Sequence, residues 1–451
     1  MRLNIETFWQ GTWHPSASIT IQDDVRGVAG PSIVEYDIDF FVNHAAADRL
    51  KNDVRDARAL SVNYPVDLEN RYRETWPPFL LDLMPQGHAR RKLADHMKID
   101  VDARASDLPL LLRAGGNPIG NLRIAEAAAA ERDRLSPVRR AGVTENDIFG
   151  RTEYFIEVVD RFGMLASGSS GLQGEWPKVS LTLATDGLYY PDALVRDDEA
   201  VSHYIVKLLR SNDERDRLIL EAEAGYSVIA ESLGLHVHET SRYANGVLMI
   251  PRFDRKCADG ALLRFGQESM VSALGVAEFG HLASHEDYIG VLKRVSTDPF
   301  ADIAEYVKRD VANRAMGNPD NHGRNSALSK TPGGEIGLSP LFDFAPMRLG
   351  ADGVVKSTRW AAMRDTHRDT TPDWAEVCDA VFPDDEGLSH RLRDEIADFA
   401  EGLLDAPAIA KEIGIPQEVI DVAMRDCQTV AESVMAARQQ TTNAVARTLG
   451  R

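Results

Sequence analysis

The sequence predicts an α+β fold in which strands are concentrated in the first part of the chain and helices dominate the rest. Residues 1 to about 125 mix strand-like segments with helical ones. Residues from about 150 to 255 then follow the order strand, glycine-rich loop, strand, strand, helix, strand. Beyond them the pattern is mostly helical, apart from a hairpin expected over residues 328–338 around Gly333-Gly334.

Within the first stretch, residues 18–22 and 32–37 have strand character, and a glycine-rich turn precedes a third strand-like segment at 122–124. Residues 77–97 are expected to be helical, with apolar side chains at intervals and basic ones near the end. Residues 125–140 are rich in Ala, Glu and Arg, which is compatible with either a helix or a mobile linker.

The middle stretch contains the clearest strand and the clearest helix. Residues 203–208 predict a strand whose pleat places Tyr204, Val206 and Leu208 on one face and Lys207 on the other. Residues 214–233 have the apolar spacing of a helix that ends at Gly234. Further strands are expected at residues 179–184, at 188–190 after an Asp186-Gly187 turn, and at 247–250.

Length and composition set broad limits. A chain of 451 residues is too long for one core and suggests two or three domains. Its three cysteines, Cys257, Cys378 and Cys427, are far apart, which favours free thiols in a reducing compartment. Because the first residues lack a signal-peptide pattern and no long apolar run is present, we expect a cytoplasmic protein without a membrane span.

The formal net charge of −19 weighs against one class of function. A protein that grips nucleic acid through its own surface is usually basic, at least in one domain. Here acidic residues are spread along the chain and basic clusters are short. We therefore expect no direct contact with nucleic acid, whereas a basic protein partner would suit this surface.

Three residues between 320 and 343 have the spacing of a phosphotransfer centre. Asp320 and Asn325 lie five apart in GNPDNHGRN, as the base and the metal-binding Asn do in the D-x-x-x-x-N pattern of kinase catalytic loops. Asp343 follows eighteen residues later in SPLFDFAP. Phosphoryl transfer needs one carboxylate to orient the attacking hydroxyl, and an amide plus a second carboxylate to hold Mg²⁺ against the phosphates.

Residues suited to binding a nucleotide precede this motif. Glycines in SGSSGLQGEWPK would let backbone N–H groups approach phosphate oxygens. Lys207 on its strand could offer a charge to the α- and β-phosphates, oriented by Glu223 or Glu221 on the next helix. The order of glycine loop, strand lysine, helix acid, D-x-x-x-x-N and final Asp is that of a bilobal kinase.

At this point the sequence resembles a family, the HipA-type serine/threonine kinases, which are the toxin halves of bacterial toxin–antitoxin pairs. PPFLLDLMPQGHARRKLADHM and LPLLLRAGGNPIGNLRI look like parts of its N-terminal subdomain. GLQGEWPK, HYIVK, EAEAGYSVIAESLGL, PRFDRK, GQESM, GNPDNHGRN and PLFDFAP follow in the family's order, so that the resemblance covers roughly residues 75 to 350. It implies a bilobal protein-kinase-like α+β fold with an N-terminal α/β subdomain and a largely helical C-lobe.

The resemblance also implies roles for particular residues. Asp320 would be the catalytic aspartate, with His322 beside it in the catalytic loop, and Asn325 and Asp343 would hold Mg²⁺. The residues implied in ATP binding are Lys207, Gly171, Gln173, Phe253, Gln267 and Glu223. The family regulates itself by phosphorylating a serine of the glycine-rich loop, for which Ser167, Ser169 and Ser170 are the candidates here.

The domain organisation and function follow from the same resemblance. We expect an N-terminal subdomain over residues 1–145, a kinase N-lobe over 146–255 and a helical C-lobe over 256–451. The expected activity is ATP- and Mg²⁺-dependent phosphorylation of a protein, such as an aminoacyl-tRNA synthetase or another translation factor, with growth arrest as the result. A helix-turn-helix antitoxin is an expected partner, although the extra residues in GLQGEWPK resemble a divergent branch in which an antitoxin gene is not always adjacent.

Two other classes of function remain open from the sequence. Antibiotic and sugar phosphotransferases share the D-x-x-x-x-N…D logic, although they lack a comparable N-terminal subdomain. A catalytically weak co-repressor that partners a DNA-binding antitoxin is the second. The retention of every expected metal and phosphate residue weighs against the co-repressor.

The histidines suggest a metal site only superficially. His281 and His285 are four apart, with Glu286 beside them, a spacing that would bring two imidazoles to one face of a helix. No HExxH pattern supplies the other groups of a catalytic zinc site. We therefore interpret both as surface or core histidines.

Overall fold

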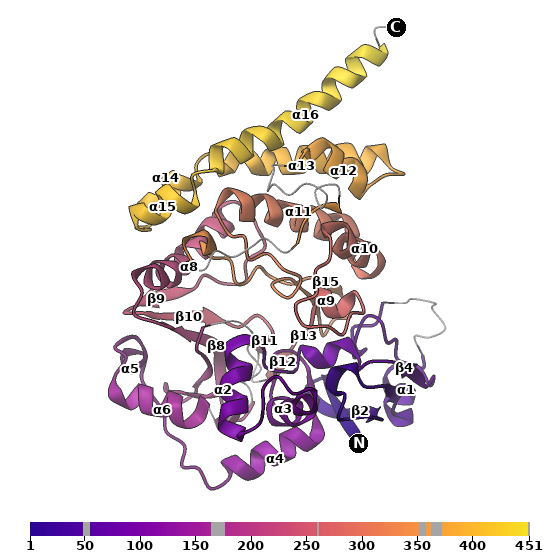
Figure 1. Ribbon diagram of the computed structural model, residues 1–451, viewed down its shortest axis with the longest axis vertical. Coiled ribbons are helices and arrows are strands. Elements are labelled where there is room, and N and C mark those ends of the chain that lie inside the picture. The colour runs from indigo at the N-terminus through magenta and orange to yellow at the C-terminus, as the bar shows by residue number, and fades with distance from the viewer. Residues whose placement is uncertain (48–54, 164–175, 259–260, 351–357, 362–371, 450–451) are drawn as a thin grey trace. The chain divides into compact units, whose positions relative to one another are not determined.

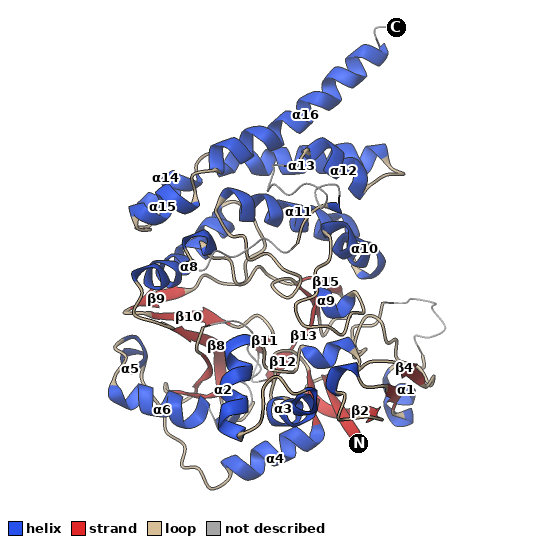
Figure 2. Cartoon of the chain, in the orientation of Figure 1, coloured by secondary structure: helices blue, strands red, loops and turns tan. Residues whose placement is uncertain are grey.

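The computed structural model describes residues 1–47, 55–163, 176–258, 261–350, 358–361 and 372–449. The chain divides into two compact units, whose elements are labelled in Figure 1. The first comprises Met1–Arg210, Arg242–His281 and Ala327–Ile336, and the second comprises Ser211–Ser241, Leu282–Ser326 and Gly337–Arg451. Figure 2 shows that most strands belong to the first unit and that the second is largely helical.

An antiparallel sheet opens the first unit, with the strand order β4-β3-β2-β1-β5. Gln10 and Gly11 join β1 to β2, both with positive φ (51° and 85°), which suits the right-handed twist of a tight hairpin. The strands are β1 (Arg2–Trp9), β2 (Thr12–Ile21), β3 (Ser32–Tyr36), β4 (Arg71–Arg73) and β5 (Leu122–Ile124). The structure confirms the strands expected near residues 18–22, 32–37 and 122–124, whereas sequence analysis missed β1.

Four helices accompany this sheet: α1 (Ile38–His44), α2 (Gly87–Met97), α3 (Asp107–Ala114) and α4 (Ala125–Leu135). The helix expected over residues 77–97 is wrong in its first half, where Pro78–Leu81 form only a 3₁₀ turn. Pro85 lacks a backbone N–H, and Gly87 has a φ of +54°, so a continuous helix cannot form across them. Of the alternatives left open for 125–140, the structure shows a helix over Ala125–Leu135.

A second antiparallel sheet has the order β7-β6-β8-β10-β9. Val206 and Leu208 of β8 lie in its core, with Tyr204 packed beside them, which confirms the face predicted for that strand. Its strands are β6 (Lys178–Ala184), β7 (Tyr189–Pro191), β8 (Ala200–Leu208), β9 (Arg242–Ala244) and β10 (Val247–Pro251). Side chains from α5 (Glu145–Phe149) and α6 (Glu153–Gly163) complete the core.

The first unit also contains three short strands that sequence analysis missed. They are β11 (Arg255–Ala258), β12 (Ala261–Arg264) and β13 (Gly266–Ser269), followed by the one-turn helix α9 (Met270–Ala273). The expectation of mostly helical structure after residue 255 is therefore wrong over this stretch, because four-residue strands leave too little alternation to detect. The predicted hairpin is confirmed: β14 (Ala327–Lys330) and β15 (Ile336–Leu338) flank a turn in which Gly334 has a φ of +98°.

The second unit begins with α8 (Glu214–Ser232), the predicted helix. The Asp213 side chain accepts a hydrogen bond from the Arg215 N–H (2.8 Å) and caps the first turn, and Gly234, with a φ of +78°, follows the last. Its other helices are α10 (His285–Val295), α11 (Pro299–Ala315), α12 (Trp374–Val381), α13 (Glu386–Leu403), α14 (Ala406–Glu412), α15 (Gln417–Ala423) and α16 (Cys427–Leu449). Within this unit α11 packs against α10, α13 and α16 (Figure 1).

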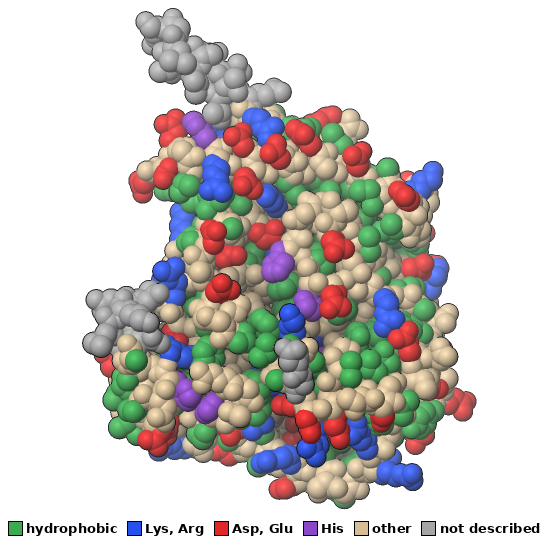
Figure 3. Space-filling model, turned by 180° about the vertical axis from the view of Figure 1, so that it is seen from behind, with side chains coloured by type: hydrophobic (Ala, Val, Ile, Leu, Met, Phe, Trp, Pro, Cys, Tyr) green, Lys and Arg blue, Asp and Glu red, His purple; other side chains and the backbone are tan. Residues whose placement is uncertain are grey.

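Surface and thiol properties complete the description. On the face shown in Figure 3, acidic and basic side chains are interspersed, so its described residues form no continuous basic strip. All three cysteines are free thiols, as expected, and burial raises the pKa of Cys378 and of Cys427 to about 12. No helix in the described ranges is both long and apolar enough to cross a membrane.

Candidate active site

The predicted catalytic loop follows α11 through a sharp turn at Gly317. This glycine has a φ of +69°, and a Cβ there would lie 2.6 Å from the carbonyl oxygen of Ala423. Only glycine therefore fits without strain. The Arg348 N–H donates to the Gly317 carbonyl (3.0 Å), which joins the start of the catalytic loop to the segment that follows Asp343.

The loop folds back so that Asp320 and Asn325 meet. The Asn325 Nδ2 donates to the Asp320 carbonyl oxygen (2.8 Å), and the Asn325 N–H donates to the His322 carbonyl (2.9 Å). The five-residue spacing thus corresponds to a closed, hydrogen-bonded loop. This part of the prediction depends only on local sequence, and the structure brings these two residues together.

Asn318 links this loop to Asp343. Its Nδ2 donates to Asn313 Oδ1 (2.8 Å) and lies 3.5 Å from the Asp343 carbonyl, while its Oδ1 accepts from the Asp320 N–H (3.3 Å). One buried amide therefore contacts the end of α11 and the backbones of the predicted catalytic Asp320 and the predicted metal-binding Asp343. Sequence analysis did not single out Asn318, although the three Asn residues of GNPDNHGRN were a signal of such bonding.

Asp343 has a backbone conformation that is rare for a residue with a side chain, with a φ of 51°. The next residue, Phe344, is buried, and its ring lies 5.2 Å from that of Tyr226. The Tyr226 hydroxyl in turn donates to the Met316 carbonyl (2.8 Å) at the end of α11. The packing of Phe344 therefore holds the chain at Asp343, and strain of this kind is concentrated at functional sites.

His322 lies beside the predicted catalytic carboxylate. Its Nδ1 accepts a hydrogen bond from the Arg324 N–H (3.2 Å), and its Nε2 lies 3.6 Å from Asp320 Oδ1. Because Nδ1 is an acceptor, the ring proton of neutral His322 is on Nε2 and faces Asp320. Both side chains are partly exposed, at 39% and 33%, so each is accessible to a substrate.

Helix α10 packs against the predicted catalytic loop through Tyr288. A Cβ at Gly323 would lie 2.0 Å from the Tyr288 hydroxyl, so glycine is needed for the loop to pack on that ring. The neighbouring Asn321 is buried, and its Nδ2 lies 3.3 Å from Asp310 of α11. Two helices of the same unit therefore determine where the loop lies.

The donor atoms of this site fit a hard divalent cation. Mg²⁺ prefers oxygen ligands, and Asn325 and Asp343 offer an amide and a carboxylate oxygen. Since Nδ2 of Asn325 is engaged with the Asp320 carbonyl, its Oδ1 is the atom suited to a cation. In the described part of the chain no three His, Cys, Asp or Glu side chains gather as a metal site.

His285 is a fully buried core residue whose Nδ1 is hydrogen-bonded to Tyr306, as the sequence interpretation expected.

Among the described residues of the first unit, those implied in nucleotide binding are Lys207, Phe253 and Gln267. Lys207 is buried near the C-terminal end of β8, opposite Leu248 of β10. Gln267 lies on β13, where its Nε2 donates to Ser329 Oγ (2.9 Å). Glu223 is buried on α8 of the second unit. Lys207, Phe253 and Gln267 therefore belong to the first unit, and Glu223 belongs to the second.

Phe253 lies between two buried, paired charges. Arg252 donates to both oxygens of Asp254 (2.8 and 2.6 Å), and Asp254 also accepts from the Gly120 N–H (2.8 Å). Burial opposes the ionisation of Asp254, but the charge of Arg252 outweighs it and lowers the pKa of the carboxyl to about 2. The N-terminal part of the chain, through Gly120, therefore helps to hold the segment that carries Phe253.

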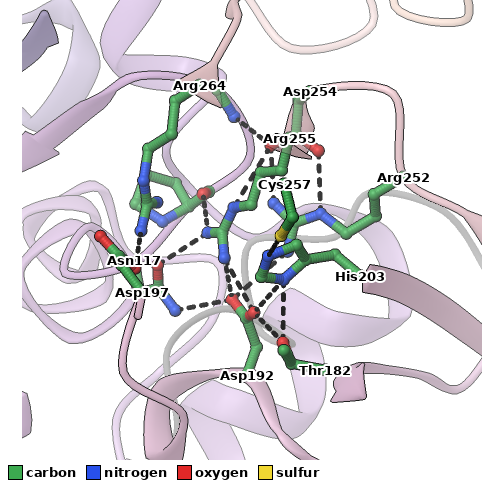
Figure 4. Close-up of polar contacts among 12 residues, drawn as sticks. Asn117, Thr182, Asp192, Asp197, His203, Arg252, Asp254, Arg255, Cys257 and Arg264 are labelled. Carbon is green, nitrogen blue, oxygen red and sulfur yellow. Dashed lines mark hydrogen bonds and ion pairs between the residues drawn. The ribbon is translucent and has the colours of Figure 1, made fainter. Parts of the chain in front are cut away.

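A larger buried cluster extends from this pair, as Figure 4 shows. Asp192 accepts from Arg255 (2.8 and 2.7 Å) and from the Thr182 hydroxyl (2.6 Å), and Arg255 also donates to Asn117 Oδ1 (2.8 Å). Burial opposes ionisation, but the charges of Arg255 and Arg252 hold the pKa of Asp192 well below its usual range. The cluster joins the loop that contains Asn117 to the second sheet.

At one edge of this cluster a histidine contacts both an aspartate and a cysteine. His203 Nδ1 lies 3.1 Å from Asp192 Oδ1, and its Nε2 lies 3.8 Å from Cys257 Sγ. A nucleophilic cysteine needs a lowered pKa. Burial and the charge of Asp197 instead raise the pKa of the Cys257 thiol, so we interpret these contacts as structural.

The predicted glycine-loop residues lie outside the described part of the chain. This applies to Gly171 and Gln173 and to the candidate phosphorylation sites Ser167, Ser169 and Ser170. Their roles remain predictions.

The HipA-like C-terminal domain matches residues 170–406, and the HipA N-terminal domain matches residues 46–125. The protein named "Putative kinase Y4mE" from Sinorhizobium fredii is 28% identical over 313 residues, which are 64% of this chain and 69% of that protein.

Among solved structures, the Shewanella oneidensis HipA toxin, in a complex with HipB and operator DNA, covers 97% of both chains with a TM-score of 0.61 and 15% identity. The Helicobacter pylori proinflammatory kinase CtkA covers 51% of this chain and 92% of its own, with a TM-score of 0.30 and 14% identity, too weak a likeness to support an argument. The likeness over nearly the whole chain confirms the predicted fold class.

Proposed function

Because this chain belongs to the HipA family, we propose that it is a serine/threonine protein kinase that transfers the γ-phosphate of ATP, with Mg²⁺, to a hydroxyl of a protein. The family match extends over more than half of the chain and includes the catalytic loop. A relative named as a putative kinase adds support, since its similarity extends over 64% of the chain.

The observation that carries this proposal is the linkage of Asp320, Asn325 and Asp343 within one unit. Asn325 closes the loop on Asp320, and Asn318 connects both to the backbone of Asp343. The arrangement supplies one partly exposed carboxylate for a hydroxyl and two oxygen donors for a cation. A plain surface turn would not need a strained Asp343 held by buried Phe344.

Each residue then has a defined task. Asp320 would orient the substrate hydroxyl and accept its proton, while His322 would keep the carboxylate in place through Nε2. Asn325 and Asp343 would hold Mg²⁺, which neutralises phosphate charge when bound. Lys207 would place the α- and β-phosphates, and Phe253 would border the adenine.

The test is phosphate transfer from radiolabelled ATP by the purified protein with Mg²⁺. Asp320→Asn removes the proton acceptor and should lower the rate by roughly 10²- to 10⁴-fold. Asp384→Asn, at an exposed position outside this site, is the matched control and should retain the wild-type rate. A wild-type rate in Asp320→Asn would refute the role of Asp320. Transfer to aminoglycosides or sugars with none to protein would instead indicate a small-molecule phosphotransferase.

The target and regulation are finer parts of the proposal. We expect a translation component, such as an aminoacyl-tRNA synthetase, as the substrate and a serine among 167, 169 and 170 as the site of autophosphorylation. Intact mass and phosphopeptide mapping after incubation with ATP should find phosphate there in wild-type protein and none in Asp320→Asn. Modification confined to other peptides would contradict the assigned serines.

A helix-turn-helix antitoxin is the proposed partner. The support is that the structurally similar Shewanella protein forms a complex with HipB and operator DNA. The net charge of −19 fits a basic partner better than direct contact with DNA. Co-purification with the product of a neighbouring small gene would test the proposed partner. DNA binding by this chain alone would contradict the expectation that the chain makes no direct contact with DNA.

A further inference from the structure

A buried carboxylate on α11 lies behind the candidate catalytic loop. Asp310 is only 1% exposed, and at least four described side chains contact it. Its Oδ2 accepts from Arg314 Nε (2.9 Å) and from the Trp360 indole N–H (3.0 Å). Its Oδ1 lies 3.3 Å from both Asn321 Nδ2 and His285 Nε2. We call these five residues the Asp310 cluster.

Such a group is costly to bury unless it is paired. An isolated carboxylate loses its hydration in the interior, and a charged partner and hydrogen bonds must replace it. Arg314 supplies the compensating charge from the next turn of α11. The Trp360 indole and the Asn321 amide supply the hydrogen bonds, and they come from two segments far apart in the chain.

One arm of the cluster reaches the chain that follows the predicted metal-binding Asp343. Trp360 is 1% exposed, and its ring lies 4.7 Å from that of His285. The flanking residues are also fixed: the His285 N–H donates to the Arg359 carbonyl (3.1 Å), and the Ala361 N–H donates to the Glu286 carboxylate (2.9 Å). The start of α10 therefore holds Trp360 against Asp310.

The other arm reaches the catalytic loop. Asn321 lies between Asp320 and His322 in the chain and is buried, so its side chain points away from these two partly exposed neighbours. The bond from Asn321 to Asp310 ties the backbone of the loop at the position between them. A shift of Asp310 would therefore change the direction of both side chains.

We propose that Asp310 and Trp360 are positioning residues, through which residues 359–361 set the geometry of the catalytic loop. The indole N–H orients the Asp310 carboxylate, which in turn orients Asn321 and hence Asp320. This inference rests on the proposed kinase function and adds a means of control to the same site. A rearrangement around Trp360 would then change turnover while leaving the nucleotide-binding residues unaltered.

The decisive variant is Trp360→Phe, which keeps an aromatic ring and removes only the N–H donor. We expect kcat to fall roughly three- to tenfold, the effect of losing about one hydrogen bond, with an unchanged Kd for ATP–Mg²⁺. Trp76→Phe is the matched control, because Trp76 is equally buried at 0% exposed, belongs to the first unit, and has an indole N–H without a hydrogen-bond partner among the described residues. It should retain the wild-type kcat. A wild-type kcat in Trp360→Phe would overturn the proposal. The same loss of kcat in Trp360→Phe and in the control variant would also overturn it.

A second readout does not depend on activity. The indole signal of Trp360, one of six in the chain, can be assigned from its loss in Trp360→Phe in a spectrum of ¹⁵N-labelled protein. Asp310→Asn should shift this signal and speed its hydrogen exchange, whereas Asp384→Asn should leave both unchanged. An unshifted signal in a folded Asp310→Asn protein would overturn the proposal. If wild-type protein transferred no phosphate, the proposed function would fail, while this spectrum would still test the Asp310 cluster.

Discussion

At the scale of single residues, Asp343 combines a required side chain with an unfavourable backbone. Aspartate in the left-handed region is tolerated better than most residues because its short side chain can bond locally, but the conformation still costs roughly 1 kcal/mol or more. The buried ring of Phe344 and the Asn318 contact maintain it. Function and stability should therefore separate at this position.

Substitutions of Asp343 test that separation. Asp343→Gly should unfold at a temperature equal to or above that of the wild type, because glycine adopts a φ of 51° without strain. Asp343→Ala should lower the free energy of unfolding by roughly 1 kcal/mol and therefore unfold at a lower temperature than the wild type. Both should lose phosphate transfer, since neither offers a ligand oxygen. Thermal unfolding measured alongside activity checks this order, and greater stability of the alanine variant would contradict it.

The buried acids of the first unit should make stability depend on pH. The pKa of Asp254 is about 2 in the folded protein against an ordinary value of 3.8, and that of Asp192 is also well below its ordinary value. A lowered carboxyl pKa adds stability that is complete above the unfolded pKa and is lost as pH falls through the folded one. Unfolding free energy should therefore be level near neutral pH and decline between about pH 4 and pH 2.

The contribution of Asp254 is roughly 2 kcal/mol from the size of that shift. Denaturant unfolding of wild type and Asp254→Asn at several pH values measures it. Asp254→Asn should be less stable at pH 7 and should show a shallower decline in acid. Parallel curves for the two proteins across the whole range would contradict the assignment.

At the scale of elements, the loop before β5 supports two segments that carry predicted nucleotide residues. The Gly120 N–H donates to Asp254, next to Phe253, and a Cβ at Gly120 would lie 3.1 Å from the Gln267 N. Asn117 in the same loop accepts from Arg255. The loop that contains Asn117 and Gly120 thus supports two segments of the first unit that carry residues proposed to bind the nucleotide.

Gly120→Ala tests this support, with Gly187→Ala as its control. Both glycines have positive φ (95° and 82°), so both substitutions should cost about 1 kcal/mol of stability from the backbone alone. A Cβ at Gly187 meets nothing within 4 Å, whereas one at Gly120 presses on the Gln267 backbone. Only Gly120→Ala should weaken ATP binding in a calorimetric titration. Equal affinities in the two variants would show that the loop does not affect the nucleotide.

Elements were predictable from sequence where periodicity was long enough, or where a glycine turn marked a short strand, as at β5, β14 and β15. The helix α8 and the strand β8 have six or more residues of clear pattern, and the structure confirms both. The strands β11, β12 and β13 have four residues each and were missed. Residues 77–97 misled because apolar spacing continued across Pro85, where the backbone cannot follow it.

At the scale of the whole molecule, the candidate site was predictable only where its residues are close in the chain. Asp320 and Asn325 are joined by a local loop that their spacing encodes. The contact between Asp310 and Trp360 spans 50 positions, and that between Asp192 and Arg255 spans 63. Such pairs leave no periodic trace, because tertiary folding alone decides which distant side chains meet.

Residues assigned to ATP and Mg²⁺ belong to both units, Lys207 to the first and Asn325 and Asp343 to the second. A ligand that binds only the folded protein stabilises it by mass action, by about 2.7 kcal/mol at a hundred times its Kd. If both units bind the nucleotide, ATP with Mg²⁺ should slow hydrogen exchange around β8 and around the catalytic loop together. Lys207→Ala should weaken protection in both places.

Asp343→Asn distinguishes the protection that Mg²⁺ gives from the protection that ATP gives in the same hydrogen-exchange measurement. This variant should still bind ATP weakly but should lose the extra protection that Mg²⁺ adds, because the carboxylate ligand has become a neutral amide. Asp384→Asn should behave as the wild type in every condition. Protection confined to β8 in wild-type protein with saturating ATP and Mg²⁺ would show that the second unit does not bind the nucleotide, and the roles proposed for Asn325 and Asp343 would then be wrong.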